Sequence, residues 1–254
     1  MTTPSNPVID LQLQHRSVRR YLSTPVTDEQ LELIVTAAQR ASTSSNLQIA
    51  TVVAVRDANR KRRISGAIGG RDYVENASVF LVWIADFSRN VELVRAQGVE
   101  TETVGLIENT LVGAVDVGIA AQNALLAAES MGLGGVFVGS VRNNPEAVSA
   151  ELGLPKHAFP VVGLALGVPD PEEGTGLKPR LPLSGVLHHE TYNAAAWEHA
   201  VEAYEEEYRE YFETQGVPGR SWARTVTRRI ATPEGLHGRH TMRDSLRSQG
   251  FDSE

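Results

Sequence analysis

The feature that most constrains this chain is a long segment rich in alanine and glycine, with helix-forming residues throughout. It runs from about Asn109 to Met131 and is followed by Gly132. Because small apolar side chains occur nearly all round the predicted helix, it is expected to pack inside the protein or against a second subunit. Asp116 and Gln122 lie in its middle, and an ionisable residue is costly in lipid. The segment therefore predicts a core or interface helix and not a membrane span.

Strand and helix patterns alternate on both sides of this segment. Four apolar runs have the character of buried strands: 49–55, 78–85, 134–138 and 160–166. Pro160 is tolerable there because it falls at the first position of the predicted strand. A capping box, Thr27 followed by Gln30, begins a predicted helix over 28–40, and two more helices are expected over 59–65 and 144–152. This alternation indicates an α/β or α+β domain.

The two ends of the chain differ from this middle part. Residues 1–10 hold two prolines among small polar residues and predict a disordered lead-in, so that one domain spans 11–254. Its C-terminal helical extension, about 190–250, carries two charge blocks. The stretch from Glu198 to Glu213 contains seven glutamates and one arginine. The stretch from Arg220 to Arg247 contains seven arginines and two acidic residues. These blocks indicate either two solvated helices that pair with each other or with a second subunit, or arginines that bind a phosphorylated ligand.

Amino-acid composition excludes several classes of function for this chain. The chain has no cysteine, which excludes disulfides, thiol nucleophiles and cysteine-ligated clusters. Its formal net charge is −7, so it is not expected to bind nucleic acid by neutralising phosphates over a broad surface. The first residues lack the basic start and apolar stretch of a signal peptide. We therefore expect a cytoplasmic protein that acts on small molecules, with no nucleic acid and no membrane as partner.

Three polar clusters are candidates for ligand binding. The first is His15–Arg20, whose arginines match phosphate oxygens with paired hydrogen bonds. The second is the hydroxyl-rich run Ser42–Ser45, and the third is Leu177–Arg180, which contains one of only three lysines. Taken singly, the first is also compatible with a solvated basic turn and the second with an ordinary loop.

Motifs for other chemistries are missing from the sequence. There is neither a nucleophile elbow nor a phosphate-binding P-loop, and His188-His189-Glu190 lacks the histidine spacing of a zinc protease. The glycines of Gly132–Gly135 follow a predicted helix and precede a strand, the reverse of a dinucleotide-binding fingerprint. No metal site is predicted. Cations, hydroxyls and glycine loops fit a protein that holds a phosphorylated cofactor, which then performs the chemistry.

Six segments, in the same order along the chain, together resemble the FMN-dependent nitroreductase family, in particular its oxygen-insensitive NADPH nitroreductases and NADPH-flavin oxidoreductases. They are 15–19, 43–48, 69–71, 115–135, 142–144 and 177–180. The resemblance runs from about residue 11 to 251. It implies an α+β fold with a mixed β-sheet flanked by helices, a long central helix, and an intertwined homodimer with two FMN sites at the subunit interface.

The resemblance also implies which residues bind FMN. They are His15, Arg16, Ser17, Arg19, Ser44, Ser45, Gln48, Arg71, Phe137, Val138, Gly139, Ser140, Lys178 and Arg180. The first four match the family's phosphate-binding opening. Lys178 and Arg180 match a pair that also reaches the flavin, where a cation would stabilise the anionic reduced ring. Two residues depart from the family pattern. Arg71 stands where a glutamine often hydrogen-bonds the flavin, and Ser140 replaces a usual glycine.

NADPH is the implied hydride donor, with NADH left open. Relatives that prefer NADPH surround its 2′-phosphate with arginines, and Arg220 and Arg239 match such positions. Gln215 stands where a basic residue is common, so the predicted clamp lacks one cation. The alternative is that both arginines only neutralise the glutamate-rich helix.

The implied activity is the ping-pong, two-electron reduction of nitroaromatics, quinones or flavins by NAD(P)H. No side chain is assigned a catalytic role, because flavin N5 carries the chemistry. The alternative function is a flavin-sequestering or flavin-sensing dimer without significant turnover.

Overall fold

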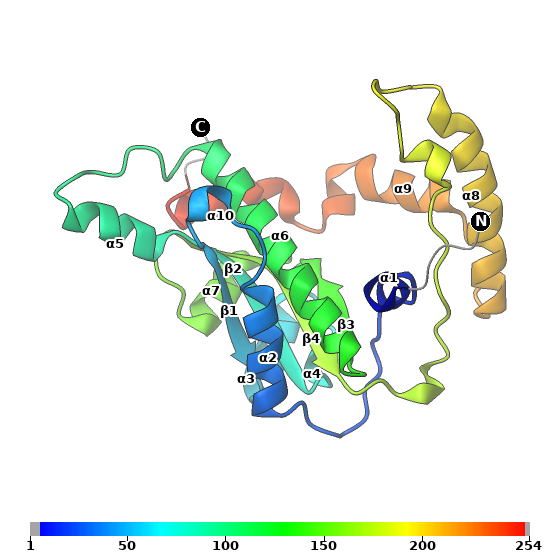
Figure 1. Cartoon of the computed structure of the whole chain (residues 1–254), viewed down its shortest axis with the longest axis horizontal. Helices are drawn as coiled ribbons and strands as arrows, with labels where there is room; N and C mark the ends of the chain where they lie inside the picture. The colour runs from blue at the N-terminus through cyan, green and yellow to red at the C-terminus, as the bar shows by residue number, and fades with distance from the viewer. Residues whose placement is uncertain (1–5, 252–254) are drawn as a thin grey trace. The chain divides into compact units, whose positions relative to one another are not determined.

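The computed structural model describes residues 6–251 (Figure 1). They divide into two compact units. The first contains the chain up to Glu173 and the residues from Gly238 onward, and the second is Gly174–His237. The sequence predicts a single domain from 11 to 254, and that boundary stays a prediction.

The first unit is built on a four-stranded sheet in the order β1-β2-β4-β3. Its strands are β1 (Ala50–Val55), β2 (Val79–Asp86), β3 (Gly134–Val138) and β4 (Ala158–Gly167). Its helices are α1 (Pro7–Leu13), α2 (Asp28–Ala38), α3 (Ala58–Ala67), α4 (Asp72–Glu75), α5 (Ser88–Ala96), α6 (Ile107–Ser130), α7 (Pro145–Leu152) and α10 (Met242–Ser248). The second unit contains α8 (Ala196–Thr214) and α9 (Trp222–Ile230).

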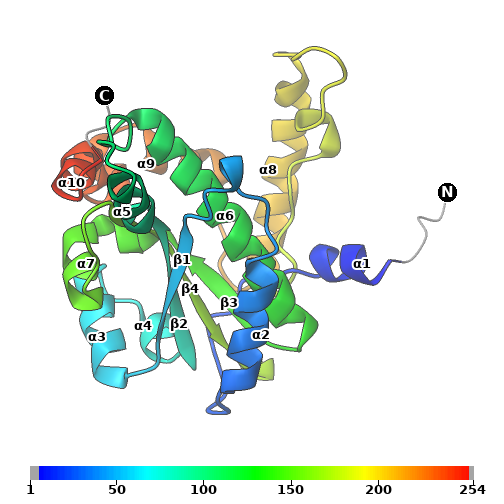
Figure 2. The same ribbon diagram turned by 60° about the vertical axis from the view of Figure 1, so that its left-hand side comes forward.

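The alternating side chains of β2 explain the three layers of the first unit. Leu81 and Trp83 belong to the core under α2 and α6, whereas Phe80 and Val82 belong to the core under α3, α4 and α7. Successive strand residues point to opposite faces, so a fully apolar strand requires cover on both sides. Figure 2 shows α2 and α6 side by side over one face of the sheet. The prediction of a doubly covered strand is confirmed.

Helix α6 confirms the expected long helix, and its buried side is made of small residues. Ala120, Ala121 and Ala124 pack against the sheet with almost no exposed surface. The opposite side is not covered, because Leu111, Val115 and Ile119 are exposed at helical spacing. The helix is long and apolar enough to cross a membrane, but 44% of its most apolar stretch is buried inside the protein. Asp116 lies within this buried side.

Three details differ from the sequence predictions. Residues 1–5 lie outside the described residues, but residues 7–10 are helical and not disordered, because Asn6 caps α1 and Pro7 occupies its first turn. Pro160 is the third residue of β4 and is accommodated at a bulge, where Trp83 pairs with Val162 and Ile84 with Pro160. All strand pairs of the described residues are antiparallel, so the mixed pairing is not seen within one chain.

Candidate functional site

The segment that carries the first polar cluster runs alongside the sheet. Val18 N donates to Gly135 O at 2.9 Å, and Leu22 N donates to Val168 O at 2.9 Å. Val18 is buried, and a Cβ atom on Gly134 would lie 2.7 Å from its Cγ2 atom. The glycine therefore permits the close approach that fixes this segment beside β3.

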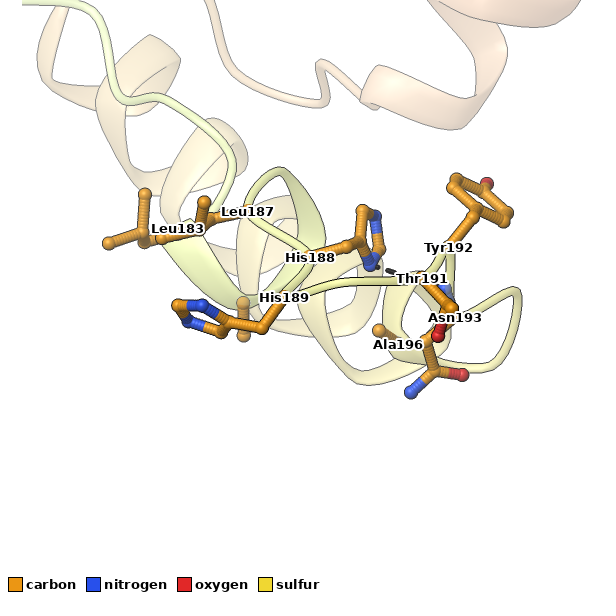
Figure 3. A pocket seen from close by; sticks show the side chains of 9 residues that line it. Leu183, Leu187, His188, His189, Thr191, Tyr192, Asn193 and Ala196 are labelled. Atoms are coloured by element: carbon orange, nitrogen blue, oxygen red, sulfur yellow. Dashed lines mark hydrogen bonds between the residues drawn. The ribbon is translucent and has the colours of Figure 1, made fainter.

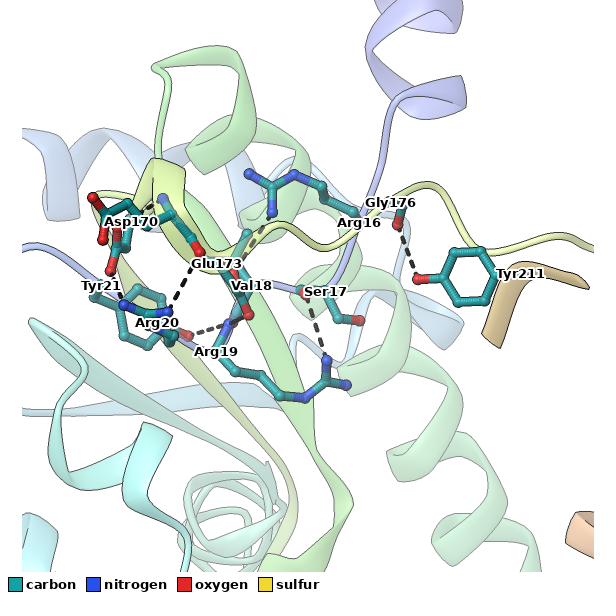
Figure 4. Close-up of polar contacts among 11 residues, drawn as sticks. Arg16, Ser17, Val18, Arg19, Arg20, Tyr21, Asp170, Glu173, Gly176 and Tyr211 are labelled. Atoms are coloured by element: carbon teal, nitrogen blue, oxygen red, sulfur yellow. Dashed lines mark hydrogen bonds and ion pairs between the residues drawn. The ribbon is translucent and has the colours of Figure 1, made fainter. Parts of the chain in front are cut away.

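Within this segment, Arg16 and Arg19 have different surroundings (Figure 4). The backbone N–H of Arg19 donates to Glu173 Oε1 at 2.8 Å, and Arg16 Nη1 lies 3.6 Å from Glu173 Oε2. The guanidinium of Arg19 is exposed and donates to the carbonyl of Ser17 at 3.5 Å, and it pairs with no carboxylate of the described residues. Arg19 thus presents a positive charge that is not neutralised locally, whereas the charge of Arg16 is partly balanced.

The neighbours of these arginines are tied into the fold. His15 Nδ1 lies 2.6 Å from Glu129 Oε1 on α6, and Arg20 Nη2 donates to Asp170 Oδ2 at 2.8 Å. Tyr21 donates its hydroxyl to Val18 O at 2.7 Å, and burial, followed by the charge of Glu173, raises the pKa of Tyr21. The tyrosine therefore stays a neutral donor that fixes the backbone of the segment.

The loop 44–48, which begins within the predicted hydroxyl-rich run and is called the serine loop below, has an unusual backbone. Ser45, Asn46 and Gln48 have φ angles of 48°, 55° and 52°, and none of the three is glycine. The N–H of Ser44 donates to both carboxylate oxygens of Asp116 at 3.1 Å. Left-handed backbone at non-glycine residues persists only when its surroundings fix it, and it is frequent at ligand sites.

Arg71 follows two glycines that turn the chain. Gly69 and Gly70 have φ angles of 97° and 66°, and Arg71 N donates to Ser65 Oγ at 2.7 Å at the start of α4. This bond fixes the backbone of Arg71, whose side chain is half-buried.

The end of β3 carries Phe137–Ser140 and leads into a short helical turn, Gly139–Asn143. Ser140 is 7% exposed, and its hydroxyl has no hydrogen-bond partner among the described residues. Arg239 Nε donates to Asn143 Oδ1 at 2.8 Å, which places it beside this turn. A Cβ atom on Gly139 would lie 3.4 Å from Arg142 Nη2 and 3.9 Å from Arg239 Nη1. The guanidinium groups of Arg142 and Arg239 therefore both lie close to Gly139, which has no side chain of its own.

In the second unit, Phe212 of α8 brings two predicted ligand-binding cations together. Lys178 Nζ lies 5.7 Å and Arg220 Cζ 5.6 Å from the centre of its ring. Arg180 is exposed and donates to the carbonyls of Lys178 and Pro179 at 3.0 and 3.3 Å. Helices α8 and α9 contact each other, because Glu205 of α8 accepts hydrogen bonds from the first N–H groups of α9.

A hollow of about 770 Å³ also lies in the second unit, where the chain enters α8 (Figure 3). Its lining includes Leu183, Leu187 and Tyr192, all exposed. His188 Nδ1 accepts from Asn193 N at 3.4 Å, and no group of three metal-ligating side chains occurs within residues 6–251. An exposed apolar lining of this kind is typical of an interaction surface.

Sequence reasoning missed several residues around these clusters. Glu173 had no signal, because its partners Arg16 and Arg19 lie far from it in the sequence. Phe212 is one of several aromatic residues in an acidic helix, and no sequence pattern distinguishes it from the others. Asp116 had a visible signal, since a carboxylate in a predicted buried helix face requires a hydrogen-bond donor from another segment.

The sheet, the long helix and the polar clusters of the first unit define an α+β protein whose candidate site is formed by arginines and hydroxyls. Comparison with known proteins is more specific. The model of the nitroreductase family matches residues 13–72 and 69–168, and the model of the nitroreductase family C-terminal domain matches 178–254. The chain belongs to the nitroreductase family.

Individual relatives agree with this assignment. The chain is 41% identical over 253 residues to the FMN reductase [NAD(P)H] of Bacillus subtilis, covering 98% of this chain and 99% of the relative. It is 39% identical to the oxygen-insensitive NADPH nitroreductase of Salmonella typhimurium, covering 89% and 91%. Among solved structures, the NADPH:FMN oxidoreductase of Vibrio harveyi complexed with NAD+ superposes with a TM-score of 0.87 at 35% identity, covering 98% and 100%.

Proposed function

We propose that this chain is an FMN-dependent NAD(P)H oxidoreductase that reduces nitroaromatics, quinones or flavins. Its membership of the nitroreductase family, together with the named activities of its relatives, carries the proposal. When bound, FMN supplies the chemistry, because it accepts a hydride from NAD(P)H and passes two electrons to an acceptor. The cytoplasm remains the expected location.

The described residues fit a flavin mononucleotide in two respects. Arg19 offers a guanidinium with no carboxylate partner, as a phosphate group requires. Ser140 offers a buried hydroxyl that lacks a hydrogen-bond partner, as expected of a group that meets a ligand. The residues proposed to hold FMN are those given by the resemblance. Among them, Arg16, Ser17 and Arg19 bind the phosphate, and Lys178 and Arg180 favour negative charge on the reduced ring.

A direct experiment tests the proposal. The purified protein is expected to be yellow, and anaerobic NADPH or NADH is expected to bleach it. Turnover with nitroaromatic and quinone acceptors separates an enzyme from a flavin-sequestering or flavin-sensing dimer. A protein that binds FMN but is not bleached would favour the second function, and one that does not bind FMN would contradict both.

We also propose a homodimer in which each flavin site takes residues from both chains. His15 is tied to Glu129 and Ser44 to Asp116, and at the usual rise of a helix these two anchors lie about 20 Å apart along α6. This separation of the anchors in one chain supports a flavin site that combines the first segment of one copy with the loop of a second copy.

Exposed apolar surface supports this dimer and gives a prediction. Leu111, Val115 and Ile119 are exposed on α6, and Leu183 and Tyr192 are exposed in the second unit. Surfaces of this kind commonly mark protein interfaces. Light scattering is expected to give twice the chain mass of 27.6 kDa. A monomeric mass with FMN still bound would contradict the shared site.

The choice of nicotinamide gives a second prediction. We propose that Arg220 and Arg239 contact the 2′-phosphate of NADPH. Arg220→Ala is expected to raise KM for NADPH about two- to fivefold, as for an exposed ion pair, and to leave KM for NADH nearly unchanged. Arg224→Ala, an exposed arginine four residues further along, serves as the control. An equal change for both donors would assign Arg220 a structural role on Phe212.

A further inference from the structure

The serine loop stores conformational strain that its own sequence does not relieve. Ser45, Asn46 and Gln48 all occupy the left-handed region, although no glycine occurs between Ser42 and Gln48. Such residues are strained, and they keep this conformation only where other contacts hold them. The loop therefore requires restraints from outside.

Three side chains beyond the loop hold its backbone. Asp116 on α6 accepts from Ser44 N with both oxygens at 3.1 Å. On α5, Asn90 Nδ2 donates to Leu47 O at 3.1 Å, and Arg89 Nη2 donates to Gln48 O and to Thr51 Oγ1. These contacts restrain one N–H and two consecutive carbonyls, so the loop is held on both sides of its strained residues.

Asp116 and Asn90 each bury a polar group at a cost in folding free energy, so structural support alone does not explain them. Asp116 is 3% exposed, and no cation of the described chain pairs with it. The Oδ1 atom of Asn90 is buried and has no hydrogen-bond partner among residues 6–251. Burying a carboxylate without a cation, or an amide oxygen without a donor, costs free energy that the hydrogen bonds to the loop backbone must offset. The presence of Asp116 and Asn90 is explained if the loop conformation itself is required.

We propose that Arg89, Asn90 and Asp116 are positioning residues that hold loop 44–48 in the conformation needed for flavin binding. This inference rests on the proposed function. None of the three is expected to touch FMN, because each acts through the backbone of the loop. Without them the loop relaxes, and FMN must restore the strained conformation when it binds, which weakens affinity.

The test compares FMN binding to flavin-free wild type and variants. Asn90→Ala is expected to raise the Kd for FMN about three- to tenfold, as for one lost hydrogen bond. Asn90→Asp has nearly the same shape but turns an acceptor toward Leu47 O, so its loss is expected to be larger. Arg89→Ala changes an exposed side chain and so keeps the test valid if the Asn90 variants fold poorly.

Matched controls come from the same region of the chain. Asn109 Nδ2 donates to Thr103 O at 2.7 Å, which is the same type of contact on a different loop, and Arg95 of α5 pairs with Glu92. Asn109→Ala and Arg95→Ala are expected to leave FMN affinity within about twofold of wild type. The visible circular dichroism of the bound flavin is expected to change only in the Arg89 and Asn90 variants.

The outcomes separate the two proposals. A wild type that does not bind FMN would contradict the proposed function. A wild type that binds FMN, with Arg89 and Asn90 variants that match their controls in Kd and dichroism, would overturn the positioning role alone. Lowered melting temperatures with an unchanged Kd would likewise overturn it, because they would show that the contacts are merely structural.

Discussion

Arg19→Ala is expected to raise the Kd for FMN by about ten- to a hundredfold, which corresponds to the loss of a charge-assisted hydrogen bond. The guanidinium of Arg19 is exposed and has no carboxylate partner among the described residues, so its charge is available to a phosphate. For the same reason, its removal is expected to leave thermal stability nearly unchanged. Titration of flavin-free protein with FMN measures the effect.

Arg20→Ala is the matched control for this prediction. Arg20 is adjacent and exposed and has the same charge, but its guanidinium pairs with Asp170. FMN affinity is expected to be retained in this variant. If both substitutions lower the affinity equally, the effect arises from the general charge of the segment and Arg19 does not contact the phosphate. Riboflavin, which lacks the phosphate, is expected to bind wild type and Arg19→Ala alike.

Phe251→Ala is expected to lower the free energy of unfolding by about 3–5 kcal/mol, the usual cost of removing a fully buried aromatic ring. Phe251 is 1% exposed, and its ring centre lies 5.9 Å from that of Phe87 and 6.5 Å from that of Phe159. Urea denaturation of the flavin-free protein measures the change. Phe251→Leu keeps much of the apolar volume and is expected to cost clearly less. Equal, small effects of both substitutions would show that this cluster contributes little.

The sequence predicted those elements whose signal is local. The capping box at Thr27 begins α2, the apolar run of β2 is covered on both faces, and the small residues of α6 form its buried side. Each of these follows from neighbouring residues through helix capping, strand alternation or side-chain size. The start of α1 was missed because Asn6 and Pro7, which are common in turns, here act as a helix cap and a first-turn residue.

The candidate site was less predictable because its contacts join distant segments. Glu173 contacts Arg19 across more than 150 positions of the chain, and Asn90 contacts Leu47 across two strands and two helices. Such polar pairs leave no periodic pattern in a sequence. The strain of the serine loop was also hidden, because serine, asparagine and glutamine occupy the positions where glycine would have signalled left-handed backbone.

The packing of Phe251 has a consequence for how the chain is made. During translation, the strands of the first unit are synthesised first and residues 174–237 follow. The segment that carries Leu246 and Phe251 is synthesised only after both. Until that segment emerges, Ile49, Phe87 and Phe159 lack the side chains that cover them in the finished protein. The sheet unit therefore cannot complete this part of its core until the segment with Leu246 and Phe251 has been synthesised.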